Sequence, residues 1–431
     1  MDDSIYDTSW TLYSIPSPTT SLRALLSSPP STSQSPRSRS PILEKHAEAF
    51  QNSLVDRHRP RYEDEEEREK LGGLRAVSWT RLAPTSRDEA SPRRKQKRKR
   101  NETTLDDSHI ALERGLLVSL VYDKATYRFA IISAQQHGTS NKRTKTSASS
   151  DSSSSRTADE ADSAAIVLAK ASPAVFKAFH GYLTSTFAIQ DMHALKLPPA
   201  FLASTLARYI SSIYAVLSQT TSERQLPQDM KAILGTIKLS ISFSAPIAPS
   251  LKMLDVEVPS ESVLVALRDL DTDRDGRDGR ERRGRDDPTA QSILKVLSRW
   301  VHERTGISLP LGPDETQRTA PSQSHASSTN PNHIDPGNPD PGKSSADAAH
   351  APRSEPPMRV SRILSAAYAI SSEGRLKLSL KSAQTCEDGP ADGDHGGDFA
   401  RDGSWNVVRK ANETLLAAAV QEAARQLSED S

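Results

Sequence analysis

The chain has 431 residues, of which 35 % are hydrophobic and 5 % aromatic, and its 28 prolines accompany long serine runs, so much of its length is not expected to enter a packed core. The formal net charge of +1 gives the whole chain no strong attraction to nucleic acid or acidic membranes, and the single cysteine, Cys386, excludes an internal disulfide framework and a cysteine-based zinc site. No run of eighteen apolar residues exists and the first residues are acidic, so we expect a soluble protein of a reducing compartment without membrane contact.

The first half of the chain predicts strands and helices separated by biased segments. Alternating side chains predict a strand over residues 10–15, and apolar residues at helical spacing predict a helix over residues 41–55. Residues 74–82 alternate again and predict a strand with apolar character on both faces. The remaining expected elements are the two strands of a hairpin, a short buried strand, and a helix that starts at Ser172 and Pro173, over residues 110–122, 125–133, 164–169 and 172–187.

The second half predicts longer helices and a late hairpin. A broad apolar stripe predicts a core helix over residues 199–218. Alternation predicts strands over residues 233–243 and 251–258, while residues 262–270 are ambiguous. The other expected elements are a helix, a hairpin of two strands and a closing helix, over residues 288–304, 359–370, 375–380 and 405–427.

Runs of strands followed by runs of helices, without strict alternation, favour an α+β fold with a mainly antiparallel sheet and packed helices, interrupted by long insertions. We expect the core to be built from residues 1–27, 41–82, 109–134, 163–270, 288–310 and 358–431. We expect linkers, disordered insertions or loops over residues 28–40, 83–108, 135–162, 271–287, 311–357 and 383–403.

Residues 337–344, GNPDPGKS, have the glycine, lysine and serine spacing of a phosphate-binding loop. Such a loop works only between a buried strand and a helix, because their geometry makes backbone N–H groups converge on the phosphates. The flanking residues predict neither element, and Pro339 and Pro341 lack the N–H that the loop requires. We therefore interpret the motif as a chance match in a linker and expect no nucleotide at Lys343.

Residues 271–282, DTDRDGRDGRER, place Asp271, Asp273 and Asp275 at the first, third and fifth positions of an EF-hand loop. The twelfth position should supply a bidentate glutamate but is Arg282, so a mixed-charge linker is the better interpretation. The short sequence motifs of hydrolases and metalloproteases are also absent from the chain. We expect no enzyme activity, cofactor or metal site.

A basic run, PRRKQKRKR, occupies residues 92–100. Its cationic side chains have no aromatic or apolar partner in the run and cannot be buried, so they must be exposed. They are Arg93, Arg94, Lys95, Lys97, Arg98, Lys99 and Arg100. Such a run is a nuclear import signal or an arm that contacts phosphates, and we favour import.

The last expected strand, residues 375–380, is a candidate partner-binding edge. Its polar and apolar side chains alternate in the order Arg375, Leu376, Lys377, Leu378, Ser379 and Leu380. If the strand lies at the edge of the sheet, its unpaired backbone groups can receive a strand from another chain, and lysines guard such edges against indiscriminate pairing. The alternative is an ordinary interior strand of a hairpin.

Residues 6–18, YDTSWTLYSIPSP, resemble the opening of the CENP-L family of inner-kinetochore subunits, whose fungal members begin with a similar strand. Trp10, Thr11, Leu12 and Tyr13 match this motif residue by residue. The later order of elements, with a hairpin and a closing helix that starts near a tryptophan, supports the resemblance.

The resemblance implies an α+β protein with a curved antiparallel sheet and no enzyme activity. It implies pairing with a CENP-N-like subunit in the constitutive centromere-associated network, contact with other inner-kinetochore subunits, and an indirect link to centromeric chromatin. The expected location is the nucleus, at the kinetochore of the centromere. A structural kinetochore subunit is therefore the favoured function. The alternatives are a nuclear chromatin or nucleic-acid-binding protein that uses the basic run, and a nucleotide hydrolase or other enzyme.

Overall fold

The structure is a computed structural model of the chain, and it describes residues 3–27, 40–57, 69–82, 112–134, 164–244, 250–275, 288–309, 358–380 and 398–430. The insertions expected over residues 83–108, 135–162 and 311–357 lie outside the described residues.

The described residues form an eleven-stranded sheet in which every strand pairing is antiparallel. The strands are β1 (Ser9–Ile15), β2 (Leu74–Leu82), β3 (Leu112–Tyr122), β4 (Thr126–Ala134), β5 (Ala165–Lys170), β6 (His193–Ala194), β7 (Thr236–Phe243), β8 (Met253–Pro259), β9 (Met358–Leu364), β10 (Tyr368–Ser371) and β11 (Arg375–Leu378). Their order across the sheet is β2-β3-β4-β5-β1-β11-β10-β9-β7-β8, and β6 pairs with β1 outside this path. The predicted α+β fold with a mainly antiparallel sheet is confirmed.

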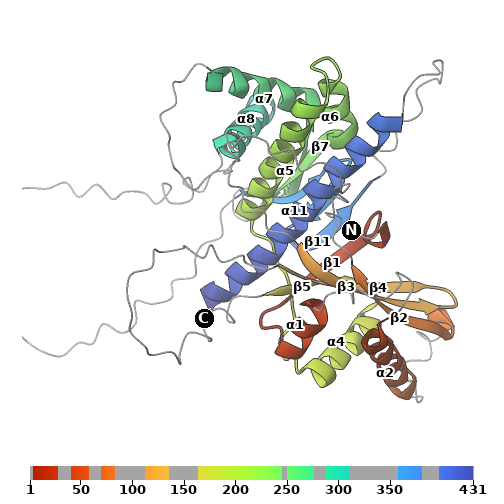
Figure 1. The fold of residues 1–431 in the computed structure, drawn as a ribbon. Helices are drawn as coiled ribbons and strands as arrows, with labels where there is room; N and C mark the ends of the chain where they lie inside the picture. Colours follow the sequence, from red (N-terminus) through yellow and green to blue (C-terminus); the bar gives the residue numbers. More distant parts are fainter. Residues whose placement is uncertain are drawn as a thin grey trace, which may run out of the picture.

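Helices cover the two halves of the sheet separately (Figure 1). The helices are α1 (Thr20–Ser27), α2 (Pro41–Arg57), α4 (Pro173–Phe187), α5 (Pro199–Thr220), α6 (Leu226–Leu234), α7 (Ser260–Asp275), α8 (Pro288–Thr305) and α11 (Asp398–Asp430). Figure 1 shows α1, α2 and α4 near β2, β3 and β4, and α5 to α8 near the opposite end of the sheet. The long α11 crosses the sheet diagonally between the two groups.

The N-terminal strand β1 joins the two halves of the sheet. Its first residues, from Ser9 to Thr11, pair with β11, and the residues from Thr11 to Ile15 pair with β5. The backbone N–H of Leu12 also donates to the carbonyl of Gly374, 2.7 Å away, in the turn before β11. A β-carbon on Gly374 would lie 2.1 Å from the carbonyl oxygen of Leu195, so only glycine fits where these segments meet.

The two faces of the sheet bury separate hydrophobic clusters. Side chains alternate between the faces of a strand, so β1 places Trp10 and Leu12 in the cluster under α5 and α11, and Ile15 in the cluster under α1, α2 and α4. Central strand β5 is buried on both faces, which explains why its sequence, AIVLA, is continuously apolar.

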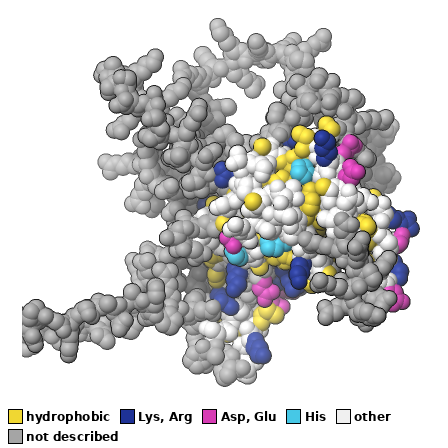
Figure 2. All heavy atoms as spheres, turned by 90° about the horizontal axis from the view of Figure 1, so that it is seen from below, with side chains coloured by type: hydrophobic (Ala, Val, Ile, Leu, Met, Phe, Trp, Pro, Cys, Tyr) yellow, Lys and Arg dark blue, Asp and Glu magenta, His cyan; other side chains and the backbone are white. Residues whose placement is uncertain are grey.

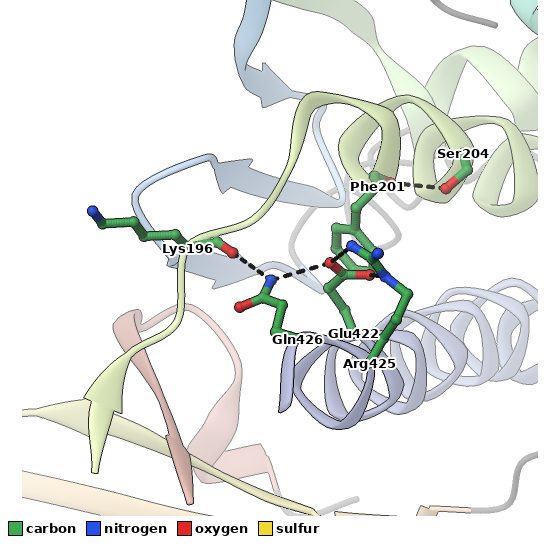
Figure 3. Close-up of polar contacts among 6 residues, drawn as sticks. All are labelled: Lys196, Phe201, Ser204, Glu422, Arg425 and Gln426. Atoms are coloured by element: carbon green, nitrogen blue, oxygen red, sulfur yellow. Dashed lines mark hydrogen bonds and ion pairs between the residues drawn. The ribbon is translucent and has the colours of Figure 1, made fainter. Parts of the chain in front are cut away.

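A polar cluster fixes α11 to the rest of the fold (Figure 3). The Glu422 side chain is 7 % exposed and forms a bidentate ion pair with Arg425, with N–O distances of 2.6 and 2.9 Å. The Gln426 amide donates to Glu422 at 3.1 Å and to the backbone carbonyl of Lys196 at 2.7 Å (Figure 3). The buried carboxylate is thus fully paired, and the helix is tied to the loop that follows β6.

Three of the expected elements begin, end or divide at other residues in the structure. The strand expected over residues 233–243 starts only at Thr236, because Ile233 and Leu234 end α6 and Gly235 terminates it with a φ of 59°. The single strand expected over residues 359–370 is two strands, β9 and β10, because a turn at Ser365 intervenes, where the Ser365 N–H donates to the carbonyl of Tyr368 at 2.8 Å. The closing helix begins at Asp398 instead of near Trp405, since extending an established helix costs little.

Helix α5 is long and apolar enough, by length and composition alone, to cross a membrane. In this structure it packs against α6, α8, α11 and β9 and buries residues such as Leu206, Ile210 and Ile213. This is the position of a core helix in a folded domain, and the expected apolar stripe over residues 199–218 is confirmed.

An aromatic cluster holds α2 against β2 and α4. The ring centroid of His46 on α2 lies 5.6 Å from that of Trp79 and 5.1 Å from that of Phe187. The Tyr182 hydroxyl donates to the His46 backbone carbonyl at 3.2 Å, and the Nδ1 atom of His46 lies 3.0 Å from the same hydroxyl oxygen. Burial lowers the pKa of His46 from its ordinary value, because the apolar surroundings disfavour the charged imidazolium.

We expect Trp10→Ala to lower the free energy of unfolding by about 3–5 kcal/mol, because it empties a site in the centre of the sheet. The indole is 1 % exposed, and its N–H donates to the Ile5 carbonyl at 2.8 Å. Chemical denaturation of the purified chain measures the change. Thr11→Ala, on the less buried side of the same strand, is the control and should cost less than about 1 kcal/mol. Equal losses in the two variants would contradict the central role of Trp10.

We expect the free energy of unfolding to fall as the pH drops below about 6.5, the ordinary pKa of histidine. The folded state holds His46 neutral to a lower pH than the unfolded state does, so protons bind preferentially to the unfolded chain in this range. Urea unfolding at several pH values measures the slope. His46→Gln should flatten it, because it removes the group whose pKa burial lowers. The same slope in wild type and His46→Gln would refute the assignment of this pH dependence to His46.

Candidate partner-binding edge of the sheet

The motif residues Trp10, Thr11, Leu12 and Tyr13 are structural. Trp10 and Leu12 are buried under the helices, and the Tyr13 ring stacks on Phe176 of α4 at a centroid distance of 4.1 Å. Thr11 pairs with strands on both sides. The motif therefore assembles the sheet, and its side chains do not form an open binding surface.

The expectation that residues 375–380 form an edge of the sheet is wrong. Arg375, Leu376 and Lys377 pair with β1 on one side, and β11 pairs with β10 on the other. Leu376, Leu378 and Leu380 are buried, Arg375 and Lys377 are exposed, and Ser379 donates to Asp7 at 2.8 Å. The alternative of an interior strand is the one that the structure adopts, because the N-terminal strand occupies the edge that the hairpin would otherwise leave open.

The order of the strands leaves β2 and β8 at the two ends of the sheet within the described residues. At β2, the exposed side chains facing away from α2 are small or polar: Ala76, Ser78 and Thr80. At β8, Met253 is 55 % exposed, and the preceding Leu251 is 43 % exposed. Val121 of β3, beside β2, is 36 % exposed, but of the two described end strands only β8 exposes a large apolar side chain on the strand itself, Met253, so we take β8 as the candidate site.

Backbone hydrogen bonds identify which groups of β8 point outward. The Phe243 N–H donates to the Lys252 carbonyl at 3.1 Å, and the β7–β8 register continues without a bulge. Because hydrogen-bonded and non-hydrogen-bonded pairs alternate in antiparallel strands, Leu254, Val256 and Val258 direct their backbone groups toward β7. The N–H and C=O groups of Met253, Asp255 and Glu257 therefore face away from β7.

The side chains of β8 divide between the two faces of the sheet. Val256 and Val258 are buried beneath α7 and α8, whereas Asp255 and Glu257 are exposed on the opposite face. A shallow apolar notch of about 10 Å³ lies beside Val258. Its walls include Val263 of α7 and Trp300 of α8, and Trp300 is itself half-buried.

The exposed side of the β7–β8 pair carries a small charge network. Lys238 of β7 forms an ion pair with Glu257, and this hydrogen bond and the attraction of the carboxylate raise the pKa of the Lys238 ammonium group. Asp255 accepts a hydrogen bond from the Ser240 hydroxyl at 2.6 Å.

On the side of the molecule that Figure 2 displays, Lys and Arg side chains of the described residues are interspersed with Asp and Glu, without a broad patch of one sign.

The other sequence-based candidates are separate from this edge. The basic run of residues 93–100 and the nucleotide-loop match of residues 337–344 lie outside the described residues. The backbone of Asp271, Asp273 and Asp275 continues α7, so this segment is helical where an EF-hand would need a loop, and α7 extends beyond the expected start of the linker at residue 271. Among the described residues, no group of three or more His, Cys, Asp or Glu side chains is placed to hold a metal ion.

Sequence reasoning predicted β8 as a strand but did not single it out as an edge. Its alternation, LDVEV, indicates one buried and one solvated face. The available signal was the pair of acidic residues on the solvated face, since charged side chains are common on edge strands. That signal is equally compatible with an interior strand of a half-exposed sheet.

A search of curated proteins found no match to this chain. Comparison with known protein families matches residues 4–424, nearly the whole chain, to the family described as CENP-L, centromere protein L. The match includes the motif strand, both halves of the sheet and most of α11. The chain therefore belongs to the centromere protein L family and is a protein of the centromere and kinetochore.

Proposed function

We propose that the chain is a structural subunit of the inner kinetochore that pairs with a CENP-N-like subunit and thereby helps to link centromeric chromatin to the kinetochore during chromosome segregation. Within the constitutive centromere-associated network it acts in the nucleus, by binding other subunits, without a catalytic step, cofactor or metal. Its contact with chromatin is made through its partners. Family membership supports the setting, and the position of β8 at one end of the sheet formed by the described residues is the observation that supports the pairing.

Strand addition is the binding mode that this edge favours. An edge strand presents a row of unpaired N–H and C=O groups, and an incoming strand satisfies them with main-chain hydrogen bonds. At β8 these groups belong to Met253, Asp255 and Glu257. The partner strand would thus extend the sheet whose two halves β1 joins within the chain.

The proposal is tested by reconstitution. We expect the full chain, co-expressed with the CENP-N-like subunit of the same species, to elute as one stoichiometric complex in size-exclusion chromatography with light scattering. Titration of the separately purified proteins should give a Kd below about 1 µM, equivalent to about 8 kcal/mol. Tagged protein purified from nuclei should recover the same subunit by mass spectrometry. Failure of two folded proteins to associate at tens of micromolar would refute the pairing.

The basic run of residues 93–100 has two possible roles: a nuclear import signal, which we favour, and an arm through which the chain itself contacts DNA. We expect replacement of Arg93, Arg94, Lys95, Lys97, Arg98, Lys99 and Arg100 by alanine to reduce nuclear accumulation, because the run acts as an import signal. The thermal unfolding midpoint should not change, since these charges cannot be buried in the core.

The matched control replaces Lys142, Arg143 and Lys145, the cations of a second basic stretch. Fluorescence imaging of the tagged variants measures nuclear accumulation. Normal accumulation of the first variant would show that import depends on another segment or on a partner. Loss of salt-dependent DNA binding by that variant would favour the alternative function.

A further inference from the structure

We infer that the partner segment on β8 is an extended strand in which apolar side chains alternate with lysine or arginine. This inference rests on the proposed pairing and specifies the chemistry of the segment that the edge selects. It follows from three features of β8: its backbone, its helix-covered face and its exposed face.

The backbone of β8 sets the register of the incoming strand. The outward groups belong to every second residue, Met253, Asp255 and Glu257, so main-chain hydrogen bonds form at these positions. β8 runs from Met253 to Pro259, and the proline lacks an N–H, which limits the ladder at that end. A partner segment of about five to seven residues therefore satisfies the edge.

The helix-covered face requires apolar side chains in the partner. Side chains of an added strand lie beside those of β8 on each face, at the cross-strand spacing of about 5 Å. On this face the neighbours are Val256 and Val258, with the apolar notch and the half-buried Trp300 next to them. A polar side chain placed there would lose water without gaining a hydrogen-bond partner, so aliphatic residues are selected.

The exposed face selects cations. On this side of the β7–β8 pair, Asp255 and Glu257 face the single lysine Lys238, which is already paired with Glu257. Asp255 accepts a hydrogen bond from a neutral hydroxyl, that of Ser240, and its charge also acts on Lys238, which it shares with Glu257; Asp255 lies on the outermost described strand. A lysine or arginine opposite Asp255 neutralises this carboxylate, and its aliphatic stem can cover the exposed Met253.

The rival interpretation is that the two carboxylates only protect an unoccupied edge against aggregation. Met253 and Leu251 argue against it, because a protected edge gains nothing from large apolar side chains that are 55 % and 43 % exposed. The acidic pair also disfavours a polyanion such as DNA at this edge, since phosphates would meet the Asp255 carboxylate.

Residue-resolved hydrogen exchange on the full-length complex tests the register. In the free chain the amides of Asp255 and Glu257 should exchange fast, while those of Leu254, Val256 and Val258 exchange slowly because they bond to β7. In the complex the Asp255 and Glu257 amides should slow by at least about tenfold. If they stay fast in an intact complex, or if β2 becomes protected instead, the inference is wrong while the pairing stands. If no complex forms, the proposed function itself fails.

Charge reversal tests the selected chemistry. Asp255→Lys should raise the Kd for the CENP-N-like subunit at least about tenfold, because it places a cation against the basic partner strand. Asp255→Asn keeps an acceptor for Ser240 and should weaken binding by a few-fold, which covers the case in which the lysine variant fails to fold.

The matched control is Glu373→Lys, which makes the same change of charge at an exposed position in the turn before β11, away from the edge. This variant should bind the partner with a Kd within about twofold of the wild-type value. Tighter or unchanged binding by both folded Asp255 variants would overturn the prediction of a basic partner strand. Hydrogen exchange would still report separately whether a strand occupies the edge.

Discussion

The hydrogen bonds on both edges of β1 hold the fold together. One edge pairs with β11 near the end of the chain, and the other pairs with β5, so a strand from the first fifteen residues joins halves that are otherwise covered by different helices. Trp10 and Leu12 lie under α5 and α11 at this junction, and the Tyr13 ring stacks on α4 from the other side. The motif that suggested the family is thus the segment on which the sheet depends.

The position of β1 also determines where a partner can bind. By pairing with β11 it occupies the edge that the C-terminal strands would otherwise present, and within the described residues it leaves β2 and β8 as the open ends. At β8, exposed apolar side chains, outward backbone groups and a solvated acidic face occur on one short strand. The same closure that stabilises the chain internally therefore directs strand addition to the far end of the sheet.

The long α11 reinforces this arrangement from the helical side. It contacts α5 and the strands β1, β3, β4 and β5, so it spans the junction that β1 makes within the sheet. Two of its buried polar side chains have specific partners: Glu422 binds Arg425 and Gln426, and the Asn412 amide oxygen accepts a hydrogen bond from Tyr209 at 3.0 Å, while the Asn412 amide nitrogen has no partner among the described residues. Buried groups of this kind require specific partners, and they fix the position of the helix more narrowly than apolar contacts alone.

The sequence by itself determined most of the elements, since alternation and helical spacing are local signals. The strand at residues 74–82 has the predicted bounds, and α4 has its predicted cap, in which the Ser172 hydroxyl accepts from the Val175 N–H at 3.4 Å. The sequence also determined the family, through the strand around Trp10. Only the tertiary structure decided which strands are neighbours: β11 became interior and β8 an edge. Strand pairing depends on hydrogen bonds between residues far apart in the chain, as between Thr11 and Arg375, and alternation within one strand carries no information about its partner.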